Sequence, residues 1–187
     1  MGAIIVTGVP GVGKTTVMEA AAKEASLKVV VYGTEMFEVA KAKGLVEDRD
    51  EMRRLDPEVQ KDIQRTAAEN IAKKGDVIVD THCSIATAKG FLPGLPAWVL
   101  ESLMPSAIVL VEANAEEISG RRAKDATRKR DADAPEAIAA HQAMNRSFAA
   151  AYATLTGATV AVVENHDGKL DDAIAQILPV VGVQVAR

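Results

Sequence analysis

The chain has 187 residues, of which 48% are hydrophobic and only 3% aromatic, and its formal net charge is −4 at pH 7. This length suits one domain with an aliphatic core, and no apolar run approaches the roughly 20 residues of a membrane-spanning helix. The negative charge disfavours nucleic-acid binding as a general function. The single cysteine, Cys83, cannot form an internal disulfide, and the first residues lack the basic start of a signal peptide. We therefore predict a cytoplasmic protein with no membrane association.

Short runs rich in Val and Ile alternate along the chain with longer Ala-rich segments. Such runs are typical of parallel strands that are buried on both faces of a sheet. We expect strands at Ala3–Val6, Val29–Tyr32, Val77–Asp80, Ile108–Glu112 and Thr159–Val163. We expect helices at Lys14–Ala25, Glu35–Lys43, Pro57–Lys74, Pro96–Leu103, Ala115–Ala126, Pro135–Leu155 and Asp171–Leu178. The alternation predicts an α/β fold of three layers, in which helices cover both faces of a five-stranded parallel sheet.

Three helix boundaries carry specific signals. Asp56 followed by Pro57 is typical of an N-cap with proline at the first helical position. Gly75 and Gly157 are placed to end the helices that precede them. The tail Val181–Val185 alternates like a strand, but the sequence does not say what it would pair with.

A phosphate-binding motif follows the first strand and opens the first helix, as the pattern GxxxxGK[ST] requires. Its residues are Gly8, Val9, Pro10, Gly11, Val12, Gly13, Lys14 and Thr15. Glycines let the backbone wrap a phosphate with its N–H groups, and the N-terminus of the helix adds partial positive charge. Lys14 is expected at the β- and γ-phosphates, Thr15 at Mg²⁺, and Thr16 at the phosphates. The motif predicts a P-loop NTPase fold.

Asp80 ends the third expected strand, which reads Val-Ile-Val-Asp. In P-loop proteins an acid at this position orients a water around Mg²⁺. We therefore expect Asp80 to act on the metal through water. The alternative is that Asp80 only caps the turn that follows.

Residues 121–130 form a basic cluster, with six Arg and Lys and one acid. Arginines offset the charge of phosphates during phosphoryl transfer, and a self-repelling basic segment suits a short lid at about 121–135. The alternatives are a solvated helix end or a contact with RNA phosphates. Further along, Met144, Phe148, Tyr152 and Leu155 form an apolar stripe that we expect in the core. Arg146 leaves that stripe, so it points either to solvent or to the phosphates.

Several polar residues follow the second and third strands, at the sheet edge where open α/β folds bind ligands. Thr34 either bonds a second substrate or caps the next helix. Arg49, Arg53 and Arg54 are candidates for an acceptor phosphate, although neighbouring acids could pair with them. His82 comes directly after the third strand and could contact the acceptor, or it could be structural.

Beyond these single features, the chain resembles the archaeal type of adenylate kinase along nearly its whole length. The resemblance is carried by IVTGVPGVGKTTV at 5–17, VYGTEMFEVA at 31–40, DRDEMRRL at 48–55, VIVDTH at 77–82, GFLPGLP at 90–96, RRAKDATRKRD at 121–131 and MNRSFAAAYA at 144–153. Bacterial relatives often carry a long lid with zinc-binding cysteines. The segment between Arg121 and Pro135 is too short for one and has no cysteine. Thr81-His82 also stands where the bacterial type has Phe-Pro-Arg.

The resemblance implies Mg²⁺-dependent, reversible phosphoryl transfer from ATP to AMP within one domain, 1–187, whose acceptor-binding segment is about 34–75. It implies that AMP binds at Thr34, Arg53 and His82, and that the adenine of ATP lies near Asn165. It also implies a homotrimer. The catalytic residues that it implies are Lys14, Arg128, Arg130 and Arg146.

Other functions stay open at this point. A GTPase is disfavoured because Glu164-Asn165-His166-Asp167 is not the guanine-reading Asn-Lys-x-Asp. A small-metabolite kinase would leave the arginines of 48–55 without an obvious use. The remaining alternatives are a broad-specificity nucleoside monophosphate kinase and an adenylate-kinase-like ATPase that acts as a nucleotide-switched factor in RNA processing.

Overall fold

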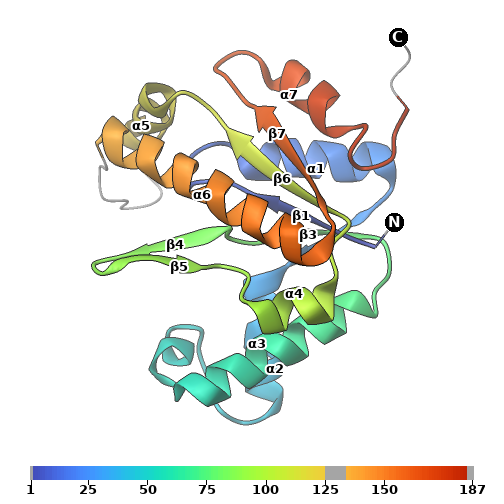
Figure 1. Cartoon of the computed structure of the whole chain (residues 1–187), viewed down its shortest axis with the longest axis vertical. Coiled ribbons are helices and arrows are strands. Elements are labelled where there is room, and N and C mark those ends of the chain that lie inside the picture. The colour runs from blue at the N-terminus through green and yellow to red at the C-terminus, as the bar shows by residue number, and fades with distance from the viewer. Residues whose placement is uncertain (1, 125–133, 185–187) are drawn as a thin grey trace.

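A computed structural model describes residues 2–124 and 134–184 of the chain. Its main sheet has five parallel strands in the order β2-β3-β1-β6-β7, and helices cover both faces (Figure 1). These strands are β1 (Ala3–Thr7), β2 (Lys28–Val31), β3 (Val77–Asp80), β6 (Ala107–Glu112) and β7 (Thr159–Glu164). The helices are α1 (Lys14–Ala25), α2 (Tyr32–Ala42), the 3-10 helix η1 (Asp50–Arg54), α3 (Pro57–Ala72), α4 (Ala97–Leu103), α5 (Ala115–Lys124), α6 (Pro135–Thr156) and α7 (Leu170–Ile177). The predicted three-layer α/β fold is confirmed.

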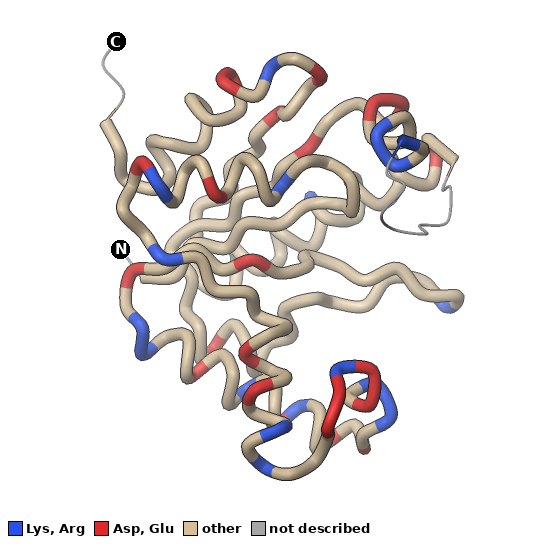
Figure 2. The backbone as a smooth tube through the Cα atoms, turned by 180° about the vertical axis from the view of Figure 1, so that it is seen from behind, with Lys and Arg blue, Asp and Glu red and all other residues tan. Residues whose placement is uncertain are grey.

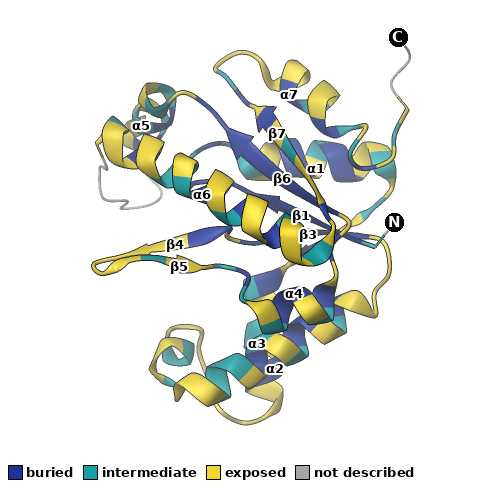
Figure 3. Ribbon diagram, in the orientation of Figure 1, coloured by how far each residue is buried: buried dark blue, intermediate teal, exposed yellow. Residues whose placement is uncertain are grey.

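The sheet separates two hydrophobic clusters because its strands are buried on both faces. Along β1, Ala3 and Ile5 belong to one cluster and Ile4 and Val6 to the other, as the two-residue repeat of a strand requires. One cluster includes side chains of α2, α3 and α4, and the other includes those of α1 and α7. The buried central strands and exposed outer helix faces are visible in Figure 3.

The helix caps follow the sequence signals at two positions. The Asp56 side chain accepts a hydrogen bond from the Glu58 amide at 2.9 Å, and Pro57 is the first residue of α3. Gly157 ends α6 in the left-handed conformation, at φ 75°. α2 differs from the prediction, because it begins at Tyr32, directly after β2. Val31 is its N-cap residue, so the prediction that Thr34 caps this helix is wrong.

A β-hairpin that the sequence did not predict projects from the molecule (Figure 1). It consists of β4 (Ser84–Thr87) and β5 (Gly90–Pro93), which pair with each other in antiparallel fashion. At its base the backbone of Gly94 passes so close to His82 that a β-carbon at Gly94 would overlap the His82 carbonyl oxygen. The glycine and its flanking prolines therefore form a tight crossing of two chain segments.

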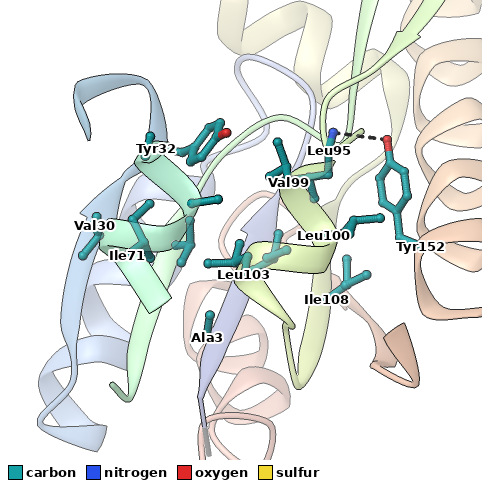
Figure 4. Packing of buried hydrophobic residues seen from close by; sticks show 14 of the residues in the cluster. Ala3, Val30, Tyr32, Ile71, Leu95, Val99, Leu100, Leu103, Ile108 and Tyr152 are labelled. Atoms are coloured by element: carbon teal, nitrogen blue, oxygen red, sulfur yellow. Dashed lines mark hydrogen bonds between the residues drawn. The ribbon is translucent and has the colours of Figure 1, made fainter. Parts of the chain in front are cut away.

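Tyr152 fixes this crossing from the side of α6. Its hydroxyl donates to the Cys83 carbonyl at 2.8 Å and accepts from the Leu95 amide at 3.4 Å, the second of which is drawn in Figure 4. Asn145 of the same helix is also buried, and its side-chain oxygen accepts from the Ser84 hydroxyl at 2.6 Å. The buried face of α6 thus carries polar groups that hold the base of the hairpin.

The apolar stripe predicted on α6 is only partly correct. Tyr152 is buried and Phe148 packs against the core, but Leu155 is 68% exposed. At the C-terminal side, residues 181–184 form no strand; Val181 is instead buried against the cluster that contains α7. None of the helices in the described part of the chain has the length and apolar character needed to cross a membrane.

Candidate active site

The P-loop connects β1 to α1 at the centre of the sheet. Gly13 is the N-cap of α1 and has φ 87°, a conformation that residues with a β-carbon rarely adopt. A β-carbon there would also overlap the Asn165 side-chain nitrogen. Glycine at position 13 is therefore required both by backbone conformation and by space.

Side chains from distant segments bind the carbonyl groups on the outside of this loop. Arg121 donates to the Val12 oxygen at 2.9 Å, and Arg122 donates to the Pro10 oxygen at 2.7 Å. Asn165, which is buried, also donates to the Val12 oxygen, at 2.8 Å. In a trans peptide the N–H points opposite to the C=O. These contacts therefore fix the direction of the next N–H groups, those of residues 11 and 13.

Lys14 projects from the first turn of α1 toward the end of β3. Its ammonium group forms an ion pair with the Asp80 carboxylate and donates to the Thr81 carbonyl at 3.1 Å. Strand β3 is hydrogen-bonded to β1, so the two residues meet at the carboxyl edge of adjacent strands. Lys14 and Asp80 thus meet at this edge of the sheet, in a direct contact that the sequence did not predict.

A cleft of about 860 Å³ lies over this edge of the sheet. One wall is the P-loop, including Lys14 and Thr15, and the opposite wall comes from α2, α3 and the segments that flank the hairpin. Other lining residues are Gly8, Val9, Pro10, Gly11, Gly13, Met36, Arg49, Gln64, Asp80, His82, Pro96 and Arg121. Of the remaining predicted loop residues, Val12 is fully buried and Thr16 is exposed on α1. The cleft has the size of a small-molecule site.

A second hollow of about 330 Å³ shares Gly33, Met36, Arg49 and His82 with the cleft, so the two are neighbours. Arg53 and Gln60 line it as well. Acidic and basic residues are interspersed along the backbone around η1, close to this hollow (Figure 2). The predicted acceptor residues Arg53 and His82 therefore lie in one connected site.

Thr34 and Arg49 contact each other beside these hollows. The Arg49 guanidinium donates to the Thr34 hydroxyl at 2.8 Å. Thr34 is exposed and sits in the first turn of α2. The contact leaves the Thr34 hydroxyl able to donate a hydrogen bond of its own.

His82 is exposed on the cleft wall, next to the Lys14–Asp80 pair. Partial loss of hydration and the Lys14 ammonium lower the pKa of His82 below its usual range. The imidazole is therefore neutral at pH 7 and can both donate and accept a hydrogen bond.

Arg146 forms an ion pair with Glu112 at the end of β6. Its Nε donates to the two Glu112 oxygens at 2.9 and 3.0 Å, and its Nη2 donates at 2.5 Å. Hydrogen bonding to Glu112 raises the pKa of Arg146. Glu112 is buried while the Arg146 side chain is 59% exposed. The carboxylate thus holds one end of the guanidinium and leaves the rest accessible to a ligand.

Two predicted catalytic residues, Arg128 and Arg130, lie outside the described residues. Arg121 and Arg122 of the same basic cluster belong to α5 and bind the P-loop, a role that the cluster alone did not reveal. The buried Glu112 was also missed. Its position as the last residue of a strand, equivalent to that of Asp80, was the available signal.

The loop after β7 joins the P-loop from the other side. The Arg121 guanidinium also donates to the Asn165 carbonyl at 2.8 Å and to the Asp167 carboxylate at 2.7 Å. His166 pairs with Glu117 at 2.8 Å, and this hydrogen bond raises the pKa of His166 and lowers that of Glu117 to about 2. Asn165 therefore has a structural task in this loop, and its contact with adenine stays a prediction.

This arrangement defines a P-loop kinase. The P-loop, with Lys14 and the strand-end residue Asp80, lines the larger cleft, and that cleft adjoins the smaller hollow that contains Arg49 and Arg53. A family profile described as "AAA domain" matches residues 7–139. The shikimate kinase of Bacteroides thetaiotaomicron has the same fold, with a TM-score of 0.59 and 12% identity over 97% of this chain and 99% of that one.

Protein relatives define the family more closely. The adenylate kinase of Methanothermobacter thermautotrophicus is 55% identical over 95% of this chain and 97% of its own length. That of Thermoplasma acidophilum is 51% identical over 96% of this chain and 98% of its own length. The chain belongs to the adenylate kinase family of archaea, and it is a nucleoside monophosphate kinase, as the motifs of the sequence predicted.

Proposed function

We propose that this chain transfers the terminal phosphoryl group of ATP to AMP, reversibly and with Mg²⁺, to give two molecules of ADP. The observation that carries the proposal is the continuity of the P-loop cleft with the hollow that contains Arg53 and His82. A kinase for nucleoside monophosphates needs two such sites side by side, so that acceptor and donor phosphates can meet.

In the proposed reaction an oxygen of the AMP phosphate attacks the γ-phosphorus of ATP in line. A new P–O bond forms as the bond to the ADP oxygen breaks, and no protein nucleophile is needed. Lys14 and the P-loop N–H groups hold the β- and γ-phosphates of ATP. Arg146, Arg128 and Arg130 are proposed to offset the charge of the transferring group. The ion pair with Glu112 supports the role of Arg146 because it limits the directions that the guanidinium can take.

The residues at the cleft fit a magnesium ion. Thr15 supplies a hydroxyl and Asp80 a carboxylate, both in the cleft lining, and oxygen ligands are those that Mg²⁺ prefers. We propose that Thr15 binds the ion directly and that Asp80 does so through water. The ion would supply charge compensation at the β- and γ-phosphate oxygens. Within the described residues no group of three or more metal-binding side chains occurs, which suits an ion held mainly by nucleotide and water.

On the acceptor side we propose that Thr34, Arg53 and His82 bind AMP. Arg53 suits the phosphate because a guanidinium can donate two parallel hydrogen bonds to phosphate oxygens. The neutral ring of His82 stands between the two hollows, close to Lys14. We assign the acceptor-binding role to about 34–75 and the lid to about 121–135, of which residues 125–133 are outside the described part.

The test is ADP formation from ATP and Mg²⁺ with AMP, CMP, UMP, GMP or no acceptor. We expect rapid turnover with AMP and only slow hydrolysis without an acceptor. Comparable rates with all four monophosphates would indicate a broad-specificity kinase. Slow ADP release that ignores every acceptor would contradict the proposal and favour a nucleotide-switched ATPase.

We further propose that the protein is a cytoplasmic homotrimer. The oligomer is supported by the projecting hairpin, on which Ile85 is 46% and Leu92 is 56% exposed. A cytoplasmic location is supported by the buried free thiol of Cys83. Light scattering after gel filtration should give three times the 19.7 kDa of one chain, and replacing both apolar residues with serine should lower that mass. A monomer at all protein concentrations would contradict the trimer.

A further inference from the structure

Glu112 is a buried acid at the carboxyl end of β6, the strand next to β1, and its side chain is only 9% exposed. The P-loop passes directly beside it. A β-carbon at Gly8, the first glycine of the loop, would overlap the carbonyl oxygen of Val111, the residue before Glu112. A buried carboxylate needs a partner, because an unpaired charge is costly to remove from water. Within the described residues, its hydrogen bonds all come from Arg146.

The backbone next to Glu112 is held by two other elements. Gln142 lies one turn before Arg146 on α6, and its side-chain amide accepts from the Ala113 N–H at 3.2 Å and donates to the Ala113 carbonyl at 3.0 Å. From the loop after β7, the Asn165 N–H donates to the Glu112 carbonyl at 2.8 Å. Residues four apart share one face of a helix, so α6 contacts the chain at two successive residues, 112 and 113. The carboxylate is therefore fixed relative to α6 and to the P-loop.

The ion pair occupies only one edge of the Arg146 guanidinium. Nε and Nη2 both donate to the Glu112 carboxylate. A guanidinium has five N–H donors in one plane, so Nη1 and the second N–H of Nη2 form another edge with parallel donors. In the part of the chain that the structure describes, this edge has no partner, and the side chain is 59% exposed. Two parallel donors match two oxygens of a phosphoryl group.

We infer that Glu112 is a positioning residue for phosphoryl transfer, which fixes Arg146 so that its Nη1–Nη2 edge donates to oxygens of the transferring group. The inference rests on the proposed reaction and on the catalytic role proposed there for Arg146. A donor that is oriented in advance needs no reorganisation when charge develops in the transition state. Without Glu112 the exposed guanidinium would turn freely in solvent. Loss of Glu112 should therefore slow the transfer, although Glu112 itself stays buried behind Arg146.

The first test measures kcat, and KM for ATP and for AMP, in the wild type and in Glu112→Gln. The amide has nearly the size of the carboxylate, but it offers one acceptor oxygen instead of two and carries no charge. We expect kcat to fall by roughly 30-fold and both KM values to stay within about 3-fold, the pattern for an interaction made in the transition state.

Glu164→Gln is the matched control. Glu164 lies opposite Glu112 in the register of β7 with β6, and its charge also acts on Arg146. Its side chain is 62% exposed, however, and among the described residues no hydrogen bond joins it to Arg146. Because an exposed charge is screened by water, kcat of this variant should stay within about 2-fold of the wild type.

The second test combines Glu112→Gln with Arg146→Ala. We expect Arg146→Ala alone to lower kcat by roughly 100-fold and the double variant to be no slower, because residues that act as one unit are not additive. Circular dichroism and urea unfolding show whether each variant is folded.

Chemical rescue gives a readout that a purely structural role of Glu112 would not move. Guanidinium ion, added to Arg146→Ala far below denaturing concentrations, can pair with the Glu112 carboxylate in the space of the missing side chain. We expect it to raise kcat of Arg146→Ala by roughly 10-fold and that of the double variant by less than about 2-fold, since a charged acceptor binds the ion more strongly than a neutral one.

The outcomes separate this inference from the proposed function. If the wild type transfers to AMP and Glu112→Gln keeps its kcat, the inference is wrong and the kinase function stands. Additive losses in the double variant, or equal rescue with and without the carboxylate, would show that Glu112 does not act through Arg146 and would also overturn it. A higher kcat in Glu112→Gln would show that the ion pair withholds Arg146 from the substrate. If the wild type transfers to no monophosphate, the proposed function fails, and the role of Glu112 fails with it.

Discussion

The proposed donor and acceptor sides of the cleft are built in different ways. The donor side is a continuous run of residues, 8–15, whose backbone carbonyls are bound from outside by Arg121, Arg122 and Asn165. The acceptor side collects single side chains from α2, η1, α3 and the segment after β3. The donor side would therefore recognise its ligand mainly through backbone groups, whereas the acceptor side would recognise its ligand through side chains.

This difference has a consequence for substitutions. Backbone recognition of phosphate carries no information about the base, and it is sensitive to any change of local conformation. Side-chain recognition carries base specificity, and it should tolerate small changes of backbone conformation. The experiments below test this contrast, beginning with the largest expected effect.

Lys14→Ala removes the ammonium group that we propose binds the β- and γ-phosphates of ATP on the donor side. We expect turnover to fall by about 10³-fold, the scale of losing a charged group that acts in the transition state, with the fold unchanged. Steady-state ADP formation and circular dichroism measure the two effects. Lys23→Ala, in the last turn of α1, should retain wild-type turnover. Near-normal activity of Lys14→Ala would invalidate the donor-site assignment.

Gly13→Ala adds a methyl group to the donor side of the cleft, and Gly33→Ala adds the same group to the acceptor side. At Gly13 the methyl meets positive φ and the Asn165 amide, so we expect about 100-fold lower kcat/KM for ATP and about 1–3 kcal/mol lower free energy of unfolding. At Gly33, in α2, the nearest atom is 3.9 Å away and φ is ordinary. There we expect less than about 3-fold change and a small gain in stability from higher helix propensity. Equal losses of kcat/KM in the two variants would contradict the proposed difference between the donor and acceptor sides.

Tyr152→Phe weakens the support of the acceptor side without touching a ligand. It removes the hydroxyl that links Cys83 and Leu95, and we expect the free energy of unfolding to fall by about 1–2 kcal/mol. Urea unfolding measures the change. Thr154→Ala removes an exposed hydroxyl from the same helix and should cost less than about 0.5 kcal/mol. If Tyr152→Phe lowers the free energy of unfolding no more than Thr154→Ala does, the crossing of the chain at Gly94 does not depend on the Tyr152 hydroxyl.

Glu117→Gln should have the smallest effect on stability. It removes the charged partner of His166, in the loop after β7. The pKa of His166 is raised above its ordinary value of 6.5, so the stability from this pair is present below that pH and lost as pH rises through the raised pKa. The pair is partly exposed, so we expect about 0.5 kcal/mol at about pH 6 and less at about pH 9. Thermal melts at both pH values, with Glu116→Gln as control, measure the difference. A larger loss at the higher pH would contradict the assignment.

The sheet and the P-loop could be predicted because their signals are local. Each strand is a short apolar run, and the motif is contiguous, so neither depends on contacts between distant residues. The hairpin of β4 and β5 could not be predicted in this way. Its strands pair only with each other, Ile85 and Leu92 are exposed, and Pro93 argues against a strand.

The site was predictable as far as it follows strand ends and motifs, as Lys14, Asp80 and His82 do. The residues that orient these groups were not, because their contacts join distant parts of the chain. Arg121 reaches Val12 across 109 positions, and Tyr152 reaches Cys83 across 69. The sequence shows that such residues are basic or aromatic, but their partners are set by packing.

The crossing at Gly94 gives the two ends of the hairpin different tolerance to added atoms. Its base admits no added atoms at Gly94, whereas its tip, Ala88 and Lys89, is exposed and lies at the far end of both strands. Insertions should be tolerated at such a tip and rejected at the base. A fluorescent label or a short peptide grafted between Ala88 and Lys89 would therefore report on the neighbourhood of the hairpin while leaving the cleft and the neighbouring hollow unaltered.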